Sequence, residues 1–339
     1  MSVMRTLTDP WMLGPVRVPN RVLLAPLAGI GNWFVRLQAK RYGAGMAVSE
    51  MVSSHAVHHG NRKTCVEMLR IDPRERAGGP VSIQLFGEDP EMMRSAVELV
   101  VGVAPDVIDI NMGCPVPKVA KTGAGAGLLA EPDRAVALAR AAVEAGDGVP
   151  VTVKLRSGLS VGDTSGYELA HRLVGEAGVA AIAFHPRSAE IAHKGVPDYD
   201  LAAALVRSLP APVILTGGLG DAPRAREAFE RTGAAALMLA RGSLGNPWLF
   251  SRLLGARDTE PSRDEVLDEL RWTVDRAAEH LGCERAARYL RKFYPWYVER
   301  MGLDRGEARR LLAALQAAPA LEDVRELLAG SKRPLELAV

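Results

Sequence analysis

The sequence predicts an α/β fold, a closed (β/α)₈ barrel followed by a smaller all-α domain at the C-terminal end. Two observations support this prediction. Short apolar runs alternate with segments of helical periodicity over about 240 residues, the usual size of such a barrel. Near residues 255–261 the composition shifts, and only helical patterns follow. A doubly wound open sheet is the alternative, but the GxGxxG loop that normally follows its first strand is missing here.

Length and composition are those of an ordinary soluble protein. Of the 339 residues, 48% are hydrophobic, enough for a full core, and the formal net charge of +2 does not indicate a nucleic-acid-binding protein. The three cysteines, Cys65, Cys114 and Cys283, form no CxxC pair, which argues against a disulfide framework or a zinc site and fits a reducing cytoplasm. Residues 1–10 lack the apolar stretch of a signal peptide, and no apolar run is long enough to span a bilayer.

The barrel strands are predicted at eight short apolar runs that alternate with helical segments, as in a parallel sheet. They are residues 21–26, 46–49, 81–86, 107–111, 151–154, 181–185, 213–216 and 236–239. The helices between them are expected at residues 33–42, 89–101, 131–145, 164–176, 199–208 and 222–232. Trp33, Phe34 and Leu37 show the apolar spacing of a helix, and Asp89 followed by Pro90 is a strong helix start.

The C-terminal part contains helical patterns alone. Amphipathic helices are predicted at residues 265–281, 286–301, 306–317 and 321–329, and Pro295 is expected to kink or break the second of them. We therefore expect two domains, a barrel over residues 1–255 and a helical domain over residues 256–339.

The turn that carries Cys114 is the first candidate for chemistry. The β-branched residues Val107, Ile108 and Ile110 indicate the end of a buried strand, and Gly113 and Pro115 force a turn around the thiol. A thiol on a loop at the end of a strand is placed to meet a ligand. The alternative is a packed apolar cysteine, the commonest fate of a free thiol.

Polar residues gather at the predicted carboxyl ends of the strands, where such barrels carry their chemistry. They are Gln84, Asn111, Lys154, His185, Thr216-Gly-Gly218 and Arg241-Gly242. Each has a structural alternative: the two amides can hold loops, Lys154 can reach into water, and His185 can be a hydrogen-bonded core residue. Their convergence on one barrel mouth favours a binding site.

The two loops at the end of the barrel predict a phosphate site. Gly217 and Gly218 follow the seventh strand, and Arg241 follows the eighth. Loops at these positions form the usual phosphate cradle of barrels, because glycines allow backbone N–H groups to approach the anion. A pair of glycines alone would indicate only a tight turn.

Several motifs together resemble the bacterial tRNA-dihydrouridine synthases, from about residue 15 to the helical tail. They are Leu24-Ala-Pro-Leu-Ala-Gly29, Ser49-Glu-Met51, Asp109-Ile-Asn-Met-Gly-Cys-Pro115, Val153-Lys-Leu-Arg156, His185-Pro-Arg187, and Arg241 with Asn246-Pro-Trp248. The chain departs from the family pattern at Leu27, where methionine is usual, at Gly31-Asn32, where Thr-Asp is usual, and at Thr216, where asparagine is usual.

The resemblance implies a TIM barrel that binds FMN, carries a helical domain and reduces the C5–C6 double bond of a uridine in tRNA, with NADPH as electron donor. It implies that Cys114 is the general acid that protonates C5, which is typically worth about 10²–10⁴ in rate. The cofactor contacts that it implies are Pro26, Leu27 and Ala28 behind the flavin ring, Gln84 and Lys154 at its polar edge, His185 near the ribityl chain, and Gly217, Gly218, Ala240 and Arg241 at the phosphate.

RNA contacts are expected in two places. Near the barrel mouth the candidates are Asn111, Lys118, Lys121, Arg187, His193 and Lys194. In the helical tail, residues 284–310 combine arginines, including Arg288 and Arg291, with aromatic side chains, a combination that suits phosphate contact and base stacking. An amphipathic helix with a solvated face is the alternative for the tail.

Three hypotheses about function are compatible with these motifs: a uridine reductase acting on tRNA or ribosomal RNA, a flavin barrel oxidoreductase acting on a small pyrimidine, and an RNA-binding scaffold without activity. The basic tail argues against the second hypothesis, and Cys114 with Lys154 argues against the third. We expect a cytoplasmic monomer that binds neither a membrane nor a metal, whereas the sequence does not specify which uridine is reduced.

Overall fold

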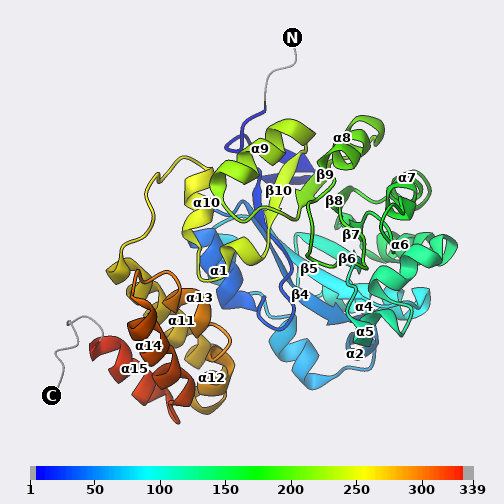
Figure 1. The fold of residues 1–339 in the computed structure, drawn as a ribbon. Helices are drawn as coiled ribbons and strands as arrows, with labels where there is room; N and C mark the ends of the chain where they lie inside the picture. Colours follow the sequence, from blue (N-terminus) through cyan, green and yellow to red (C-terminus); the bar gives the residue numbers. More distant parts are fainter. Residues whose placement is uncertain (1–4, 331–339) are drawn as a thin grey trace. The chain divides into compact units, whose positions relative to one another are not determined.

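Residues 5–330 are described by the computed structural model, in which eight parallel strands close into a barrel (Figure 1). The predicted (β/α)₈ barrel is therefore confirmed. In order around the barrel the strands are β10 (Ala236–Leu239), β3 (Val22–Leu24), β4 (Met46–Ser53), β5 (Val81–Phe86), β6 (Val107–Met112), β7 (Val151–Arg156), β8 (Ala181–His185) and β9 (Val213–Thr216).

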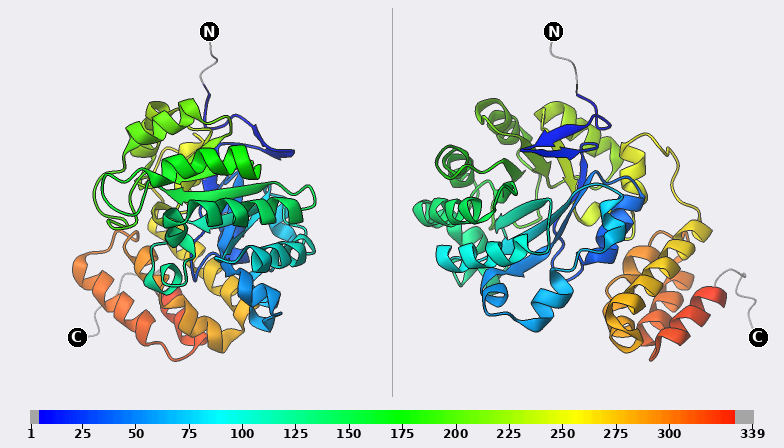
Figure 2. Two further views of the ribbon diagram at one scale, coloured as in Figure 1. Left: turned by 90° about the vertical axis from the view of Figure 1, so that its right-hand side faces the viewer. Right: turned by 180° about the vertical axis from the view of Figure 1, so that it is seen from behind.

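Helices follow the strands and surround the barrel (Figure 2). The main ones are α1 (Trp33–Arg41), α4 (Pro90–Val101), α6 (Pro132–Ala145), α7 (Ser165–Ala177), α8 (Tyr199–Ser208) and α9 (Ala222–Thr232). The N-cap predicted at Asp89 is present, since its side chain accepts hydrogen bonds from the backbone N–H groups of Glu91 and Met92.

Several short elements have no counterpart in the sequence prediction. They are the antiparallel hairpin β1 (Trp11–Leu13) and β2 (Val16–Val18), α2 (Ser54–His58), the π-helical turn η1 (Thr64–Met68), α3 (Pro73–Arg76), α5 (Pro117–Ala120), and the 3₁₀ turns η2 (Gly125–Ala130) and η3 (Arg241–Ser243). Trp11, Leu13 and Val18 of the hairpin share a buried cluster with the first residues of β6 and β8. The hairpin thus closes the end of the barrel at which the strands begin.

The barrel interior changes from apolar to polar along the strands. Val107, Ala181 and Ala236, at the starts of their strands, belong to the apolar cluster. Higher up, the register aligns Gln84 with Asp109 and Asp109 with Thr152, and the next inward position pairs Asn111 with Lys154. The polar residues therefore form a layer directly below the mouth.

The C-terminal helices form a second compact unit that begins between Gly242 and Ser243. Its helices are α10 (Trp248–Leu253), α11 (Arg263–Leu281), α12 (Cys283–Leu290), α13 (Tyr294–Val298), α14 (Arg305–Ala317) and α15 (Leu321–Gly330). The predicted boundary at residue 255 lies after α10, which this division assigns to the helical unit. The predicted helix 286–301 is divided into α12 and α13, as expected. The interruption lies at residues 291–293, and Pro295 belongs to the first turn of α13, where proline is tolerated. Its aromatic residues Tyr294 and Tyr297 are buried in the core of the unit.

Candidate functional site

The turn after β6 is held by Asn111. The Asn111 side-chain oxygen accepts hydrogen bonds from the backbone N–H groups of Gly113 (3.2 Å) and Cys114 (2.9 Å). Its amide group donates to Gln84 Oε1 at 3.0 Å and lies 3.7 Å from Met51 Sδ. Asn111 was expected to contact the substrate, but its polar atoms are engaged by the protein. The turn leaves Cys114 partly exposed.

A buried carboxylate that the prediction overlooked lies below this turn. Asp109 accepts hydrogen bonds from Gln84 Nε2 at 2.6 Å and from Thr152 Oγ1 at 2.5 Å. Burial raises the pKa of Asp109 to about 6, against the opposing effect of these two donors and of the Lys154 charge. A carboxylate inside an otherwise apolar strand was the sequence signal available for it.

Lys154 is a partly buried cation at the mouth of the barrel. Burial, reinforced by the Arg156 charge, lowers the pKa of Lys154 to about 8. Its ammonium group donates no hydrogen bond to any of residues 5–330. A poorly solvated ammonium of this kind is suited to bind an anionic or strongly polar ligand edge.

Arg156 connects the Cys114 turn to the loop after β8. Its Nε donates to the Gly113 carbonyl at 2.8 Å, and its Nη1 donates to the carbonyls of Ser188 at 3.0 Å and Ala192 at 2.7 Å. The side chain is buried, and burial lowers its pKa to about 10. Arg156 was part of a recognised motif, but no role was predicted for it.

The glycine loop after β9 lies against His185. Gly217 and Gly218 both have positive φ, 97° and 80°. A methyl group at Gly217 would lie 2.3 Å from the His185 ring, and one at Gly218 would lie 2.4 Å from the Tyr199 hydroxyl. The Tyr199 hydroxyl donates to the Gly217 carbonyl at 3.1 Å. Only glycine fits this close approach, so packing requires glycine at both positions, and the anion cradle expected here stays a prediction.

Positive charge concentrates beside this loop. Burial lowers the pKa of His185 far below its usual value, and the positive charges of Lys154, Arg156 and Arg187 lower it further. Burial and the charge of Arg241 lower the pKa of His193 to about 4. The rings of His185 and His193 stack with centroids 6.3 Å apart. Both histidines are therefore neutral at pH 7, and the arginines carry the charge.

The residues present fit a bound phosphate. Arg187 donates to the Gly195 carbonyl at 2.8 Å and lies 3.3 Å from His185 Nε2, yet its buried Nε has no hydrogen-bond partner among residues 5–330. The buried Ser188 hydroxyl also lacks a partner there. Arg241 is exposed on the loop after β10, and Ala240 precedes it. Orphaned donors beside clustered cations and a glycine cradle suit an anionic group.

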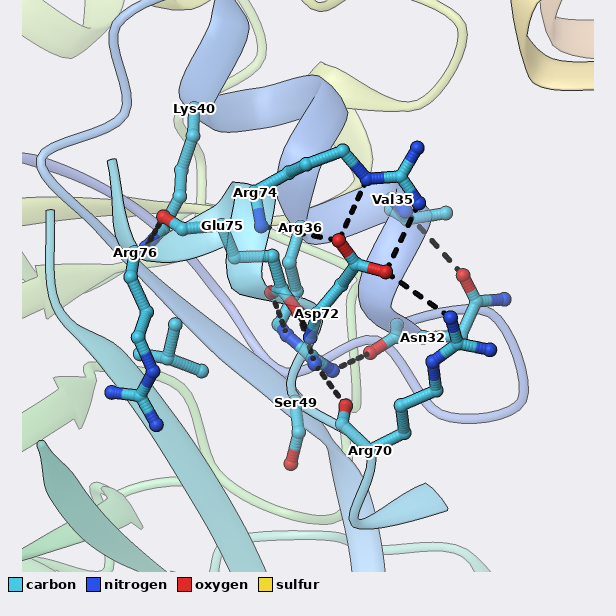
Figure 3. Close-up of polar contacts among 12 residues, drawn as sticks. Asn32, Val35, Arg36, Lys40, Ser49, Arg70, Asp72, Arg74, Glu75 and Arg76 are labelled. Atoms are coloured by element: carbon cyan, nitrogen blue, oxygen red, sulfur yellow. Dashed lines mark hydrogen bonds and ion pairs between the residues drawn. The ribbon is translucent and has the colours of Figure 1, made fainter. Parts of the chain in front are cut away.

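The loop after β3 is held by backbone hydrogen bonds and by Arg36, whose polar contacts are drawn in Figure 3. It carries Pro26, Leu27 and Ala28, of which Leu27 is buried and Ala28 exposed. Gly31 N–H donates to the Leu27 carbonyl at 2.7 Å, and the Gly31 carbonyl accepts from Arg36 Nη1 at 3.1 Å. The predicted flavin-backing residues therefore lie on a loop that is held in place by Arg36.

The remaining predicted contacts lie on exposed surfaces. Lys118 and Lys121 belong to the segment after the Cys114 turn, and Lys194 belongs to the loop after β8. Arg288 and Arg291 lie in the second unit, where Arg288 pairs with Glu284 at 3.0 Å and Arg291 is exposed. This i,i+4 ion pair between exposed side chains is typical of a solvated helix face.

Two structural features were sought in the described part of the chain, a cluster of metal-ligating side chains and a membrane-spanning helix. Within residues 5–330, no group of three or more His, Cys, Asp or Glu side chains is arranged to hold a metal ion. No helix in the same range has the length and apolar character needed to cross a bilayer.

Comparison with known proteins identifies similar sequences. Residues 23–326 match the family described as Dihydrouridine synthase (Dus). The chain is 34% identical over 309 residues to tRNA-dihydrouridine synthase B of Pseudomonas aeruginosa, covering 88% of this chain and 87% of that protein. It is 36% identical over 294 residues to a probable tRNA-dihydrouridine synthase of Rhodobacter capsulatus, covering 85% and 89%.

Solved structures with the same barrel are more distant in sequence. Morphinone reductase superposes with a TM-score of 0.58 at 19% identity, covering 78% of this chain and 94% of that one. Histamine dehydrogenase from Rhizobium sp. 4-9 superposes with a TM-score of 0.60 at 14% identity, covering 75% and 48%. At these identities the likeness concerns the fold alone.

Proposed function

The chain belongs to the dihydrouridine synthase family, and we propose that it reduces the C5–C6 double bond of a uridine in tRNA at the mouth of its barrel, giving dihydrouridine. The observation that carries the assignment of the site is the Cys114 turn. The turn presents a partly exposed thiol near the charges of Lys154 and Arg156. The glycine loop after β9 lies at the same end of the barrel. A proton donor and an anion cradle thus occupy one barrel mouth.

FMN is the cofactor that we propose for this mouth. Gly217, Gly218, Ala240 and Arg241 would hold its phosphate, with His185 neutral beside them, and Lys154 would contact the polar edge of the ring. Gln84 was expected at the same edge, but it is buried and its polar groups bind Asn111 and Asp109, so it would support the site from within the barrel. Pro26, Leu27 and Ala28 would support the ring from the loop after β3. When bound and reduced, FMN supplies the hydride that C6 of the uracil receives. NADPH is the electron donor that we propose.

The residues of the chain then have separate tasks. The Lys154 ammonium, charged below pH 8, offsets negative charge that accumulates at the polar edge of a reduced flavin. The Cys114 thiol donates its proton to C5, the S–H bond breaks as the C–H bond forms, and the thiolate regains a proton from solvent. Because the hydride adds to C6 and the proton to C5, the reduction is balanced.

RNA recognition is assigned to both units. Lys118, Lys121 and Lys194 are proposed to contact the strand that carries the target uridine, which must leave its stack to enter a barrel. Arg187, expected among these contacts, is buried beside His185 and is proposed for the phosphate site instead. Arg288 and Arg291 of the second unit are proposed to add electrostatic affinity for the phosphate backbone. A small free pyrimidine would need neither the basic residues near the barrel mouth nor those of the helical unit.

The test is a reconstituted reaction. Purified protein is incubated with FMN, NADPH and tRNA that lacks dihydrouridine, and the nucleosides are quantified by mass spectrometry. We expect one or more uridines of the tRNA to gain two mass units, with no reduction of free uracil. Reduction of uracil but not of tRNA, or protein that does not take up FMN, would overturn the proposal.

A further inference from the structure

We propose that Asp109 is a positioning residue for the Cys114 turn, acting through Gln84 and Asn111. Its catalytic consequence rests on the proposed function, because it concerns the thiol to which proton transfer is assigned. Asp109 itself touches neither the turn nor the thiol, and nothing in the reaction requires a carboxylate at that depth.

The contacts form a chain of hydrogen bonds from the turn down into the barrel. Gly113 and Cys114 donate to Asn111, Asn111 donates to Gln84 at 3.0 Å, and Gln84 donates to Asp109 at 2.6 Å. These links join residues that are 25 and 27 positions apart in the sequence. Three adjacent strands, β5, β6 and β7, contribute, since Thr152 of β7 donates to the other carboxylate oxygen.

The two ends of this chain determine the orientation of both amides. Backbone N–H groups only donate, and an ionised carboxylate only accepts. Gln84 must therefore turn its NH₂ group toward Asp109 and its oxygen toward Asn111. Asn111 must then turn its NH₂ group toward Gln84 and its oxygen toward the turn. If Gln84 lost its acceptor and its amide rotated, the Gln84 NH₂ group would point at the Asn111 NH₂ group. Asn111 would then have to rotate as well, and its oxygen would no longer accept from the N–H groups of Gly113 and Cys114.

Burial makes this arrangement costly to break. Gln84 and Asp109 are no more than 1% exposed and Asn111 is 8% exposed, so water has little access to replace a lost partner. An unpaired buried amide has a strong tendency to rotate or shift until it is satisfied. The order of the turn thus depends on the Asp109 carboxylate, to which the turn is connected through Asn111 and Gln84.

The variants needed are Asp109→Ala, which removes the acceptor, and Asp109→Asn, which keeps one. In the asparagine variant the side-chain oxygen can still accept from Gln84, while the Thr152 hydroxyl accepts from the new amide. Ser82→Ala is the matched control, because Ser82 is a buried β5 residue whose hydroxyl has no partner among residues 5–330. Where Asp109→Ala does not fold, as judged by circular dichroism, Asp109→Val fills more of the space and also lacks an acceptor.

The first measurement does not depend on RNA. In a background with Cys65→Ser and Cys283→Ser, the rate of Cys114 alkylation by iodoacetamide reports the order of the turn in the FMN-loaded protein. We expect alkylation about tenfold faster in Asp109→Ala, as expected for a turn that opens locally. Asp109→Asn and Ser82→Ala should stay within twofold of the parent.

The second measurement is single-turnover reduction of tRNA uridine with the natural cysteines in place. Asp109→Ala should slow the RNA-dependent step by on the order of 10²-fold, since small displacements of a reacting group cost that much. The KM for tRNA and the rate of flavin reduction by NADPH should change little. Asp109→Asn should recover most of the rate of the RNA-dependent step. Folded Asp109→Ala with parental alkylation and turnover would overturn the proposal. If the parent does not reduce tRNA at all, the proposed function fails, while the alkylation result still decides the role of Asp109.

Discussion

Arg36 and Glu75 form a doubly hydrogen-bonded ion pair in which neither side chain is exposed to solvent. Arg36 Nε lies 2.7 Å from Glu75 Oε2, and Arg36 Nη2 lies 3.0 Å from Glu75 Oε1 (Figure 3). Two further N–H groups of Arg36 bind the carbonyls of Gly31 and Arg70. The pair therefore joins α1 and α3 to the loop after β3, the loop that carries the proposed flavin-backing residues.

Breaking this pair should cost stability. In Glu75→Gln, Arg36 keeps its charge in a dry environment but loses the carboxylate, and only neutral acceptors remain around it, so we expect the free energy of unfolding to fall by about 3 kcal/mol. Urea denaturation followed by circular dichroism measures the change. Glu176→Gln is the control, because Glu176 pairs with Arg172 on the exposed face of α7 and should give no resolvable shift. An unchanged urea midpoint in Glu75→Gln would mean that the pair contributes nothing.

Gly217→Ala should weaken FMN binding. The new methyl group would lie 2.3 Å from the His185 ring and would also require positive φ, so the cradle must deform. Gly148→Ala is a matched control, since Gly148 has φ +83° and no atom within 4 Å of the added carbon. We expect the FMN dissociation constant to rise at least tenfold in the first variant and to stay unchanged in the second, as measured by quenching of flavin fluorescence. Equal affinities would place the phosphate elsewhere.

The pH dependence should separate Lys154 from Lys40. Burial lowers the pKa of both lysines to about 8, whereas in the unfolded chain they titrate near 10.5. Between these values the unfolded chain binds protons that the folded protein has released, so the flavin-free protein should become more stable as pH rises from 8 to 10.5. FMN affinity should fall over the same range, because Lys154 loses its charge.

Methionine variants test this assignment. Lys154→Met should remove the fall in FMN affinity above pH 8, whereas Lys40→Met should retain it, since Lys40 donates to the carbonyls of Glu75 and Gly79, away from the mouth. Each variant should also reduce the gain in the free energy of unfolding that the flavin-free protein shows between pH 8 and 10.5. FMN affinity that is constant up to pH 10 in the unmodified protein would exclude Lys154 from the flavin site.

Most of the fold could be predicted from the sequence because each barrel strand is an apolar run of a few residues bounded by helical patterns. The β1–β2 hairpin and α3 were missed because elements of three or four residues are too short to show a period. Residues at strand ends, such as Lys154 and His185, were found by position alone. Asp109 was overlooked because its partners, Gln84 and Thr152, become neighbours only through the register of the sheet.

The helical unit should contribute to RNA affinity through electrostatics. Arg288→Ala with Arg291→Ala should weaken tRNA binding and reduce the steepness of its salt dependence by about one unit for each phosphate that is no longer neutralised. Arg172→Ala with Arg231→Ala is the control, because both arginines are on barrel helices and pair with acidic residues. Titrations at several salt concentrations give the slopes. Equal slopes for both pairs would mean that Arg288 and Arg291 form only a solvated helix face.

Substitution of Cys114 tests directly whether its thiol is the proton donor in the reduction. If its thiol protonates C5, Cys114→Ala should fold, bind FMN and accept electrons from NADPH at a near-normal rate, because the turn is held through backbone N–H groups that alanine retains. Only the reoxidation of reduced flavin by tRNA should slow, by roughly 10²–10⁴-fold, since hydride addition to C6 stalls when C5 receives no proton. In Cys114→Ser the rate of flavin reoxidation by tRNA should lie between the rates of the parent and of Cys114→Ala, or be as low as that of Cys114→Ala, because a hydroxyl is a weaker acid than a thiol. A packed cysteine would behave differently: its loss would lower stability and leave turnover per folded molecule intact. Stopped-flow absorbance of the flavin with tRNA separates these outcomes, and a normal reoxidation rate in Cys114→Ala would eliminate the thiol as the proton donor.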